Sequence, residues 1–190
     1  MIFLAAQHGG GKSTLARSEA LAANGIDHVE VGKTLRARYG IEGIADPTET
    51  TRILKAYLAQ SPGEIWDAVV GEIKKRAALS LINGARELIV VGPRVLSGIE
   101  YIRGKASFGM GNLIVYIDVP EQVLLERYNA RNGSSLSAGQ FSRMLGDDFA
   151  DELREIRAAA DYVIDGNASA REVERRFIGI LRRSGYDMAA

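Results

Sequence analysis

The chain contains no cysteine among its 190 residues, and it has no excess of either charge. Without cysteine there are no disulfide bonds, no thiolate nucleophile and no zinc site with cysteine ligands. The 24 Lys and Arg residues equal the 24 Asp and Glu residues in number. Proteins that bind nucleic acid regardless of sequence usually need a basic excess, so the balance argues against that class. It does not exclude a local basic groove.

Long hydrophobic runs are also missing. No apolar stretch approaches the ~20 residues that a membrane-spanning helix needs, so we expect no association with a membrane. The first apolar segment begins at Ile2 without a basic segment before it, and we therefore expect no signal peptide. Together with the lack of cysteine, these features favour a cytoplasmic protein.

What the chain does contain is an alternation of short apolar segments with longer helical patterns. Runs rich in Ile and Val predict strands at 2–6, 27–31, 87–92, 112–118 and 161–165. Helices are predicted at 12–23, 33–39, 48–59, 63–83, 120–131, 138–158 and 169–184. Strands separated by helices predict an α/β fold, a three-layer sandwich with one five-stranded parallel sheet and helices on both faces. The length fits a single domain, 1–190.

A glycine-rich segment follows the first predicted strand. Residues 6–14 read A-Q-H-G-G-G-K-S-T, which matches the phosphate-binding loop G-x-x-x-x-G-K-[ST] except that Ala6 replaces the first glycine. Glycines let the backbone turn its N–H groups towards a phosphate, and the helix start adds further donors. Lys12 is expected to reach the terminal phosphates, and Ser13 to ligate Mg²⁺. The residues expected to bind the nucleotide are Gly9, Gly10, Gly11, Lys12, Ser13 and Thr14.

Further windows resemble the P-loop kinase superfamily. Residues 29–36 read V-E-V-G-K-T-L-R and are similar to the nucleotide monophosphate kinase pattern of a strand, Gly-Asp, apolar residues and Arg. Residues 91–103 read V-G-P-R-V-L-S-G-I-E-Y-I-R and resemble D-G-I-R-S-P-E-E-V-E-Y-F-R of archaeal proteins similar to dephospho-coenzyme A kinases and adenylate kinases. Residues 119–131 and 160–169 resemble the helix before the kinase lid and the segment near the adenine base.

This resemblance implies an ATP-dependent kinase with Mg²⁺ as its metal. It implies a lid at 131–140, with Arg127 and Arg131 leaning over the transferred phosphoryl group, while 33–86 forms the acceptor-binding region. Arg94 lies at a strand end, where a guanidinium can hold an acceptor phosphate through two hydrogen bonds. Surface ion pairs are the competing interpretation for these arginines.

Two carboxylates of the family pattern are absent, because Lys33 and Val91 occupy their positions. A kinase still needs a group that binds Mg²⁺ through water and one that orients or deprotonates the acceptor hydroxyl. Glu30, at the end of the second predicted strand, is the strongest candidate. Asp118 is the alternative, and a helix cap is its competing role. His8 is expected near the ribose or in solvent rather than as a base.

We therefore predict that the γ-phosphoryl group of Mg·ATP moves to a hydroxyl or phosphate of a nucleotide-like small molecule. One alternative is a phage-type kinase that acts on a hydroxymethylated base in DNA, which makes nucleic acid the acceptor. Another is a P-loop ATPase or nucleotide switch without an acceptor, and the loss of the family carboxylates would be its signature. The sequence does not indicate the oligomeric state.

Overall fold

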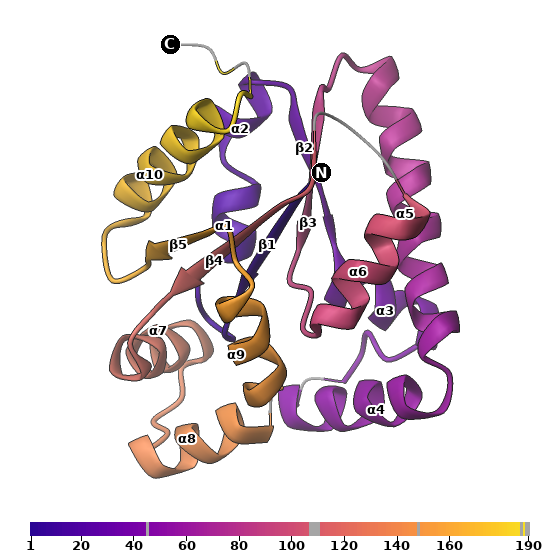
Figure 1. Cartoon of the computed structure of the whole chain (residues 1–190). Helices are drawn as coiled ribbons and strands as arrows, with labels where there is room; N and C mark the ends of the chain where they lie inside the picture. The colour runs from indigo at the N-terminus through magenta and orange to yellow at the C-terminus, as the bar shows by residue number, and fades with distance from the viewer. Residues whose placement is uncertain (45, 107–110, 148, 187, 189–190) are drawn as a thin grey trace.

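The computed structural model describes residues 1–44, 46–106, 111–147, 149–186 and 188. These residues form a three-layer α/β sandwich (Figure 1) around one five-stranded sheet with the strand order β2-β3-β1-β4-β5. All neighbouring strands are parallel. The strands are β1 (Ile2–Ala6), β2 (Ile26–Glu30), β3 (Glu87–Val91), β4 (Leu113–Asp118) and β5 (Tyr162–Asp165). The predicted fold class is confirmed, and each predicted strand end lies within one residue of the observed end.

Helices cover both faces of the sheet. They are α1 (Lys12–Ala16), α2 (Glu19–Ala23), α3 (Val31–Tyr39), α4 (Pro47–Gln60), α5 (Pro62–Ile82), α6 (Leu96–Lys105), α7 (Glu121–Asn132), α8 (Ala138–Asp147), α9 (Ala150–Ala158) and α10 (Ala170–Arg183). One core cluster joins the sheet to α1, α2, α7, α8 and α10, and the other joins it to α3, α5, α6 and α9. Within the described ranges, no helix is both long and apolar enough to cross a membrane.

The central strand β1 fixes the position of the loop that follows it. Its five residues are all buried, and they alternate between the two core clusters, as neighbouring residues of a strand must. It pairs with β3 on one side and with β4 on the other. The glycine-rich loop therefore begins at the middle of the sheet's carboxyl edge, where parallel α/β sheets bind ligands.

Two helix predictions need correction, and one helix was missed. The helix predicted at 12–23 is two helices, because the Ser18 hydroxyl accepts a hydrogen bond from the Leu21 N–H (3.3 Å) and caps a new helix start. The helix predicted at 138–158 is also divided, since Phe149 adopts a left-handed φ of 58° between α8 and α9. Helix α6 was not predicted; no side chain caps its start, and Gly98 weakens its helical pattern.

A close contact between α5 and α6 leads to a stability prediction. A Cβ added at Gly98 would lie 2.5 Å from the ring of Trp66, which is buried in the core, so one of the two must shift. We expect Gly98→Ala to lower the free energy of unfolding by about 1–3 kcal/mol, as overpacking does, when measured by urea denaturation. Gly104→Ala is the control in the same helix, because a Cβ there meets nothing within 4 Å. Equal losses for the two variants would contradict the packing argument.

Candidate functional site

The loop after β1 has a backbone that requires glycine. Gly9 and Gly11 have left-handed φ angles of 81° and 82°. A Cβ at Gly10 would lie 2.7 Å from the Cβ of Ala6 and 3.1 Å from the Gln7 carbonyl oxygen. The loop is therefore a cradle that side chains would fill, which fits the close approach of a phosphate to backbone N–H groups.

Lys12 lies across this loop. Its Nζ donates to the carbonyl oxygens of Ala6 (3.0 Å) and Gln7 (2.8 Å). A Cβ at Gly92, directly after β3, would lie 3.6 Å from the Lys12 Cε. The ammonium group is thus held between the ends of two neighbouring strands, where it can contact a phosphate bound in the loop.

The Glu30 carboxylate contacts Ser13 in α1, the helix that follows the loop. The Ser13 hydroxyl donates to Glu30 Oε2 (3.0 Å), and Arg17 donates to and pairs with Oε1. Burial raises the pKa of Glu30, but the hydrogen bonds from Arg17 and Ser13 outweigh it, so the pKa lies below its ordinary value. The sequence rule that strand ends meet at one edge placed Glu30 correctly beside the loop.

The Ser13 hydroxyl and the Glu30 carboxylate suit Mg²⁺. No group of three or more His, Asp or Glu side chains forms a metal cage in the described part of the chain. Mg²⁺ often binds through one or two protein groups plus substrate phosphates and water, rather than in a complete protein cage. The donor set therefore fits a metal that arrives with a triphosphate.

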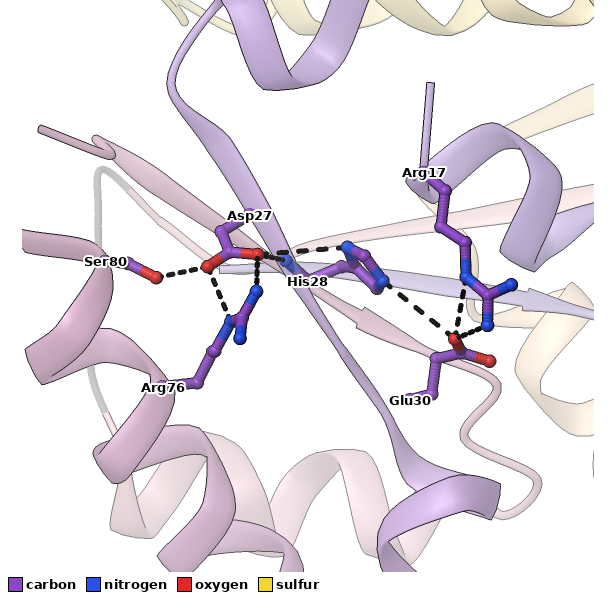
Figure 2. A network of polar contacts seen from close by, with 6 residues as sticks. All are labelled: Arg17, Asp27, His28, Glu30, Arg76 and Ser80. Atoms are coloured by element: carbon purple, nitrogen blue, oxygen red, sulfur yellow. Dashed lines mark hydrogen bonds and ion pairs between the residues drawn. The ribbon is translucent and has the colours of Figure 1, made fainter. Parts of the chain in front are cut away.

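Glu30 also belongs to a polar network along the edge strand β2 (Figure 2). The Asp27 carboxylate accepts two hydrogen bonds from Arg76 (2.6 and 2.8 Å) and one from the Ser80 hydroxyl, both of them on α5. The His28 ring lies between two carboxylates, with its nitrogens 3.9 Å from Asp27 Oδ1 and 3.9 Å from Glu30 Oε1. This network connects Glu30, through His28 and Asp27, to helix α5.

His28 makes stability depend on pH. Burial lowers the pKa of His28, and this outweighs the opposite effect of the Asp27 and Glu30 carboxylates. The unfolded chain therefore takes up this proton at a higher pH than the folded chain, so the free energy of unfolding falls as pH drops below the ordinary histidine value. We expect urea denaturation to show a smaller fall for His28→Gln than for the unmodified chain between about pH 8 and about pH 5. Equal falls would show that His28 does not contribute.

Two cavities meet at the glycine-rich loop. The first, here called the loop cavity, has a volume of about 760 Å³. It runs along the loop towards the start of α10, and it is lined by all six residues expected to bind the nucleotide and by Glu30, Arg94, Arg127, Arg131 and residues 168–171. Its size is within the range of small-molecule sites.

The second cavity, here called the apolar cavity, has a volume of about 220 Å³. Among the described residues, those of its lining that carry a charge are Arg36 and Arg94. Most of the described wall is apolar: Val31, Leu35, Ile44, Leu54, Leu58, Ile65, Trp66, Val95 and Phe149. Lys55 of α4 lies over the Phe149 ring (4.7 Å), which links the two sides of this wall. The two cavities share His8, Gly32, Arg36, Gly92 and Arg94, so they adjoin.

The structure brings the predicted site residues together. Arg127 donates to the Gly166 carbonyl (2.9 Å), and Arg131 Nη2 lies 2.8 Å from His8 Nε2. Asp118, the alternative carboxylate, instead pairs with Arg157 (2.7 Å) and is not among the residues that line the two cavities. No role was assigned from the sequence to Arg36, although it falls one helical turn after Gly32 in the kinase-like window.

Comparison with known proteins gives structural matches alone. No protein-family model and no curated protein matches the sequence. The chain is similar to shikimate kinase from Aquifex aeolicus (TM-score 0.59, 17% identity, 97% of each chain covered). It is also similar to shikimate kinase from Acinetobacter baumannii in complex with shikimate (TM-score 0.55, 17% identity, 98% of this chain and 94% of that one). A sugar kinase from Janibacter sp. HTCC2649 matches with a TM-score of 0.57 at 15% identity, over 95% of this chain and 93% of that one. The chain therefore has the P-loop kinase fold.

Proposed function

We propose that this chain is an ATP-dependent phosphotransferase that moves the γ-phosphoryl group of Mg·ATP to a small nucleotide-like molecule in the apolar cavity. The observation that carries the proposal is the junction of the two cavities. A phosphate-binding loop on one side and a pocket with two arginines on the other share one wall. A nucleotide switch or an ATPase without an acceptor needs the phosphate-binding loop but not the adjoining pocket.

On the donor side, the residues at the loop position the triphosphate and balance its charge. Lys12 would contact the terminal phosphates, while Ser13 and Glu30 would hold Mg²⁺, which balances the charge of the triphosphate when it is bound. Their close contact (Ser13 Oγ to Glu30 Oε2, 3.0 Å) supports this assignment. Phosphoryl transfer depends mainly on such positioning and charge stabilisation.

On the acceptor side, Arg36 and Arg94 bind an anionic group, and the apolar wall packs against a ring. Guanidinium groups suit phosphates and carboxylates, and Trp66 and Phe149 supply flat apolar surface. Most of this wall comes from α3, α4 and α5, which supports 33–86 as the acceptor-binding region. The shikimate bound to one of the similar kinases is also a small molecule.

The proposed lid is the segment 131–140 that joins α7 to α8. The Asn129 side chain stabilises the conformation of this segment, because it donates to the Leu136 carbonyl (3.1 Å) and accepts from the Ser134 hydroxyl and the Leu136 N–H. Arg131 precedes this turn and lines the loop cavity. We propose that Arg131 binds the phosphates of the nucleotide. Arg127, which donates to the Gly166 carbonyl, would form part of the wall of the loop cavity.

A screen of phosphoryl transfer from labelled ATP tests the proposal. The acceptors are nucleoside monophosphates, dephospho-coenzyme A, shikimate, simple sugars and DNA that contains hydroxymethylated bases. We expect a small molecule with a ring and an anionic group to take up label and to accelerate ADP formation. Label on the DNA alone would favour the DNA kinase, and hydrolysis that no acceptor changes would favour the ATPase.

Arg94→Lys tests the acceptor side separately. Lysine keeps the charge but loses the fork that binds an anion through two hydrogen bonds. We expect kcat/KM for the acceptor to fall about ten- to a hundredfold, which corresponds to the free energy of one hydrogen bond to a charged group. The affinity for ATP should change little. Arg38→Lys on α3 is the control, because Arg38 is not among the residues that line the two cavities. An equal loss of ATP binding would place Arg94 on the donor side.

A further inference from the structure

Among the described residues that the two cavities share, one side chain can accept a proton. Among the five shared residues, Gly32 and Gly92 have no side chain that reacts, and the guanidinium groups of Arg36 and Arg94 stay protonated. The remaining residue is His8, and an imidazole is a side chain that can act as a base. Glu30 lines the loop cavity but not the apolar cavity, so it lies outside the junction.

We propose that His8 is a catalytic residue that takes the proton of an acceptor hydroxyl during phosphoryl transfer. This inference rests on the proposed kinase function and narrows its acceptor to a hydroxyl compound. An acceptor phosphate is already ionised near neutral pH and needs no base. A hydroxyl group at the junction has its proton within reach of the imidazole, while Arg36 and Arg94 hold the anionic part of the same molecule.

The contact with Arg131 fixes the form of the imidazole. Arg131 Nη2 lies 2.8 Å from His8 Nε2, and a guanidinium can only donate. Nε2 must therefore accept, which makes it the unprotonated nitrogen and assigns the proton to Nδ1. Tyr128, one helical turn before Arg131 on α7, has its ring 6.0 Å from the His8 ring and 5.9 Å from the Arg131 guanidinium carbon. Helix α7 thus supplies the hydrogen bond that Nε2 accepts.

Charged groups of both signs line the cavities with His8, as far as the described residues show. The cations are Lys12, Lys33, Arg36, Arg94, Arg127, Arg131 and Arg171, and the anions are Glu30 and Glu174, both in the loop cavity. His8 thus lies in the same cavity as the cations of the phosphate-binding loop, where an acceptor hydroxyl would meet the transferred phosphoryl group.

Nucleotide binding releases the base. Arg131 lines the loop cavity, and a phosphate is a stronger partner for a guanidinium than a neutral imidazole is, because that hydrogen bond joins opposite charges. Arg131 moves its hydrogen bond to the triphosphate, and Nε2 then faces the junction. His8 accepts the proton as the hydroxyl O–H bond breaks. The acceptor oxygen bonds to the γ-phosphorus, and the bond to the bridging oxygen breaks with its electron pair leaving on ADP.

The test compares His8→Gln with the unmodified chain in single-turnover transfer across the pH range. The unmodified chain should lose rate at acid pH as the imidazole becomes protonated. Glutamine keeps the size and a hydrogen-bond acceptor but cannot take the proton. We expect its rate near neutral pH to fall about 10²–10⁴-fold, the usual contribution of a positioned base, and the loss of rate at acid pH to disappear. Mg·ATP should still raise its melting temperature.

His28→Gln is the matched control, because it removes the only other histidine in the sequence. It should retain the loss of rate at acid pH. A wild-type rate or an unchanged pH profile in His8→Gln would overturn the role of His8. Transfer of the label to a phosphate group of the acceptor, rather than to a hydroxyl group, would overturn it as well. If the unmodified chain labels no acceptor, the kinase proposal itself fails. If it labels a hydroxyl compound and His8→Gln does so equally well, only the inference about His8 fails.

Discussion

Lys12→Ala is expected to abolish phosphoryl transfer and to leave the chain folded. The ammonium group lies between the carbonyls of Ala6 and Gln7, at the position where terminal phosphates bind in such loops. Its removal leaves the charge that develops on the transferred group without its nearest compensating cation. A loss of at least about 10³-fold in the single-turnover rate is expected, comparable with the loss of other positioned charges in catalysis.

Thermal melting with and without Mg·ATP completes this experiment. At a hundredfold excess over Kd, a ligand that binds only the folded chain stabilises it by about 2.7 kcal/mol, which raises Tm by roughly 5–10 °C for a chain of this size. Lys12→Ala should lose most of that rise, while its Tm without nucleotide should change little. Lys75→Ala, an exposed lysine of α5, is the control. Full activity in Lys12→Ala would show that the loop does not bind the reacting phosphates.

Glu30→Gln is expected to lower kcat by about 10²-fold or more. The amide has the shape of the carboxylate, but it removes the negative charge that accepts from Ser13 and pairs with Arg17. A role on the metal side predicts a higher Mg²⁺ concentration for half-maximal rate and a retained loss of rate at acid pH. Mg·ATP should still protect the variant against thermal unfolding.

Asp118→Asn is the control for this variant, because Asp118 pairs with Arg157. Its activity should stay near that of the unmodified chain. An inactive Asp118→Asn together with an active Glu30→Gln would assign the acidic role to the end of β4. A Glu30→Gln variant that needs no more Mg²⁺ but loses its pH dependence would make Glu30 the proton acceptor in place of His8.

The fold was predictable because β1, β3 and β4 are short apolar runs, as buried parallel strands are, and helical patterns separate the strands along the chain. The local rule that strand ends share one edge was also enough to place Glu30 beside the phosphate loop. Helix boundaries were harder to predict. The hydroxyl of Ser18 competes with a continuous helix at 12–23, and apolar periodicity does not show that competition.

The acceptor side could not be predicted, because its walls come from segments that only the tertiary structure brings together. Phe149 reaches the apolar cavity from between α8 and α9, far along the chain from the Trp66 and Leu54 that it joins there. The contact between His8 and Arg131 spans 123 residues. No pattern within the loop indicates that a histidine there meets an arginine of α7.

The central position of β1 has a consequence for synthesis. This fully apolar strand is made first, but its partners in the sheet follow much later, since Ile2 pairs with Ile89 of β3 and with Leu113 of β4. At about 5–20 residues per second, the strand that becomes the middle of the sheet waits roughly 4–17 s for β3 to leave the ribosome. During that time the five apolar residues of β1 have neither of their partner strands, and an unpaired apolar strand favours aggregation of the nascent chain.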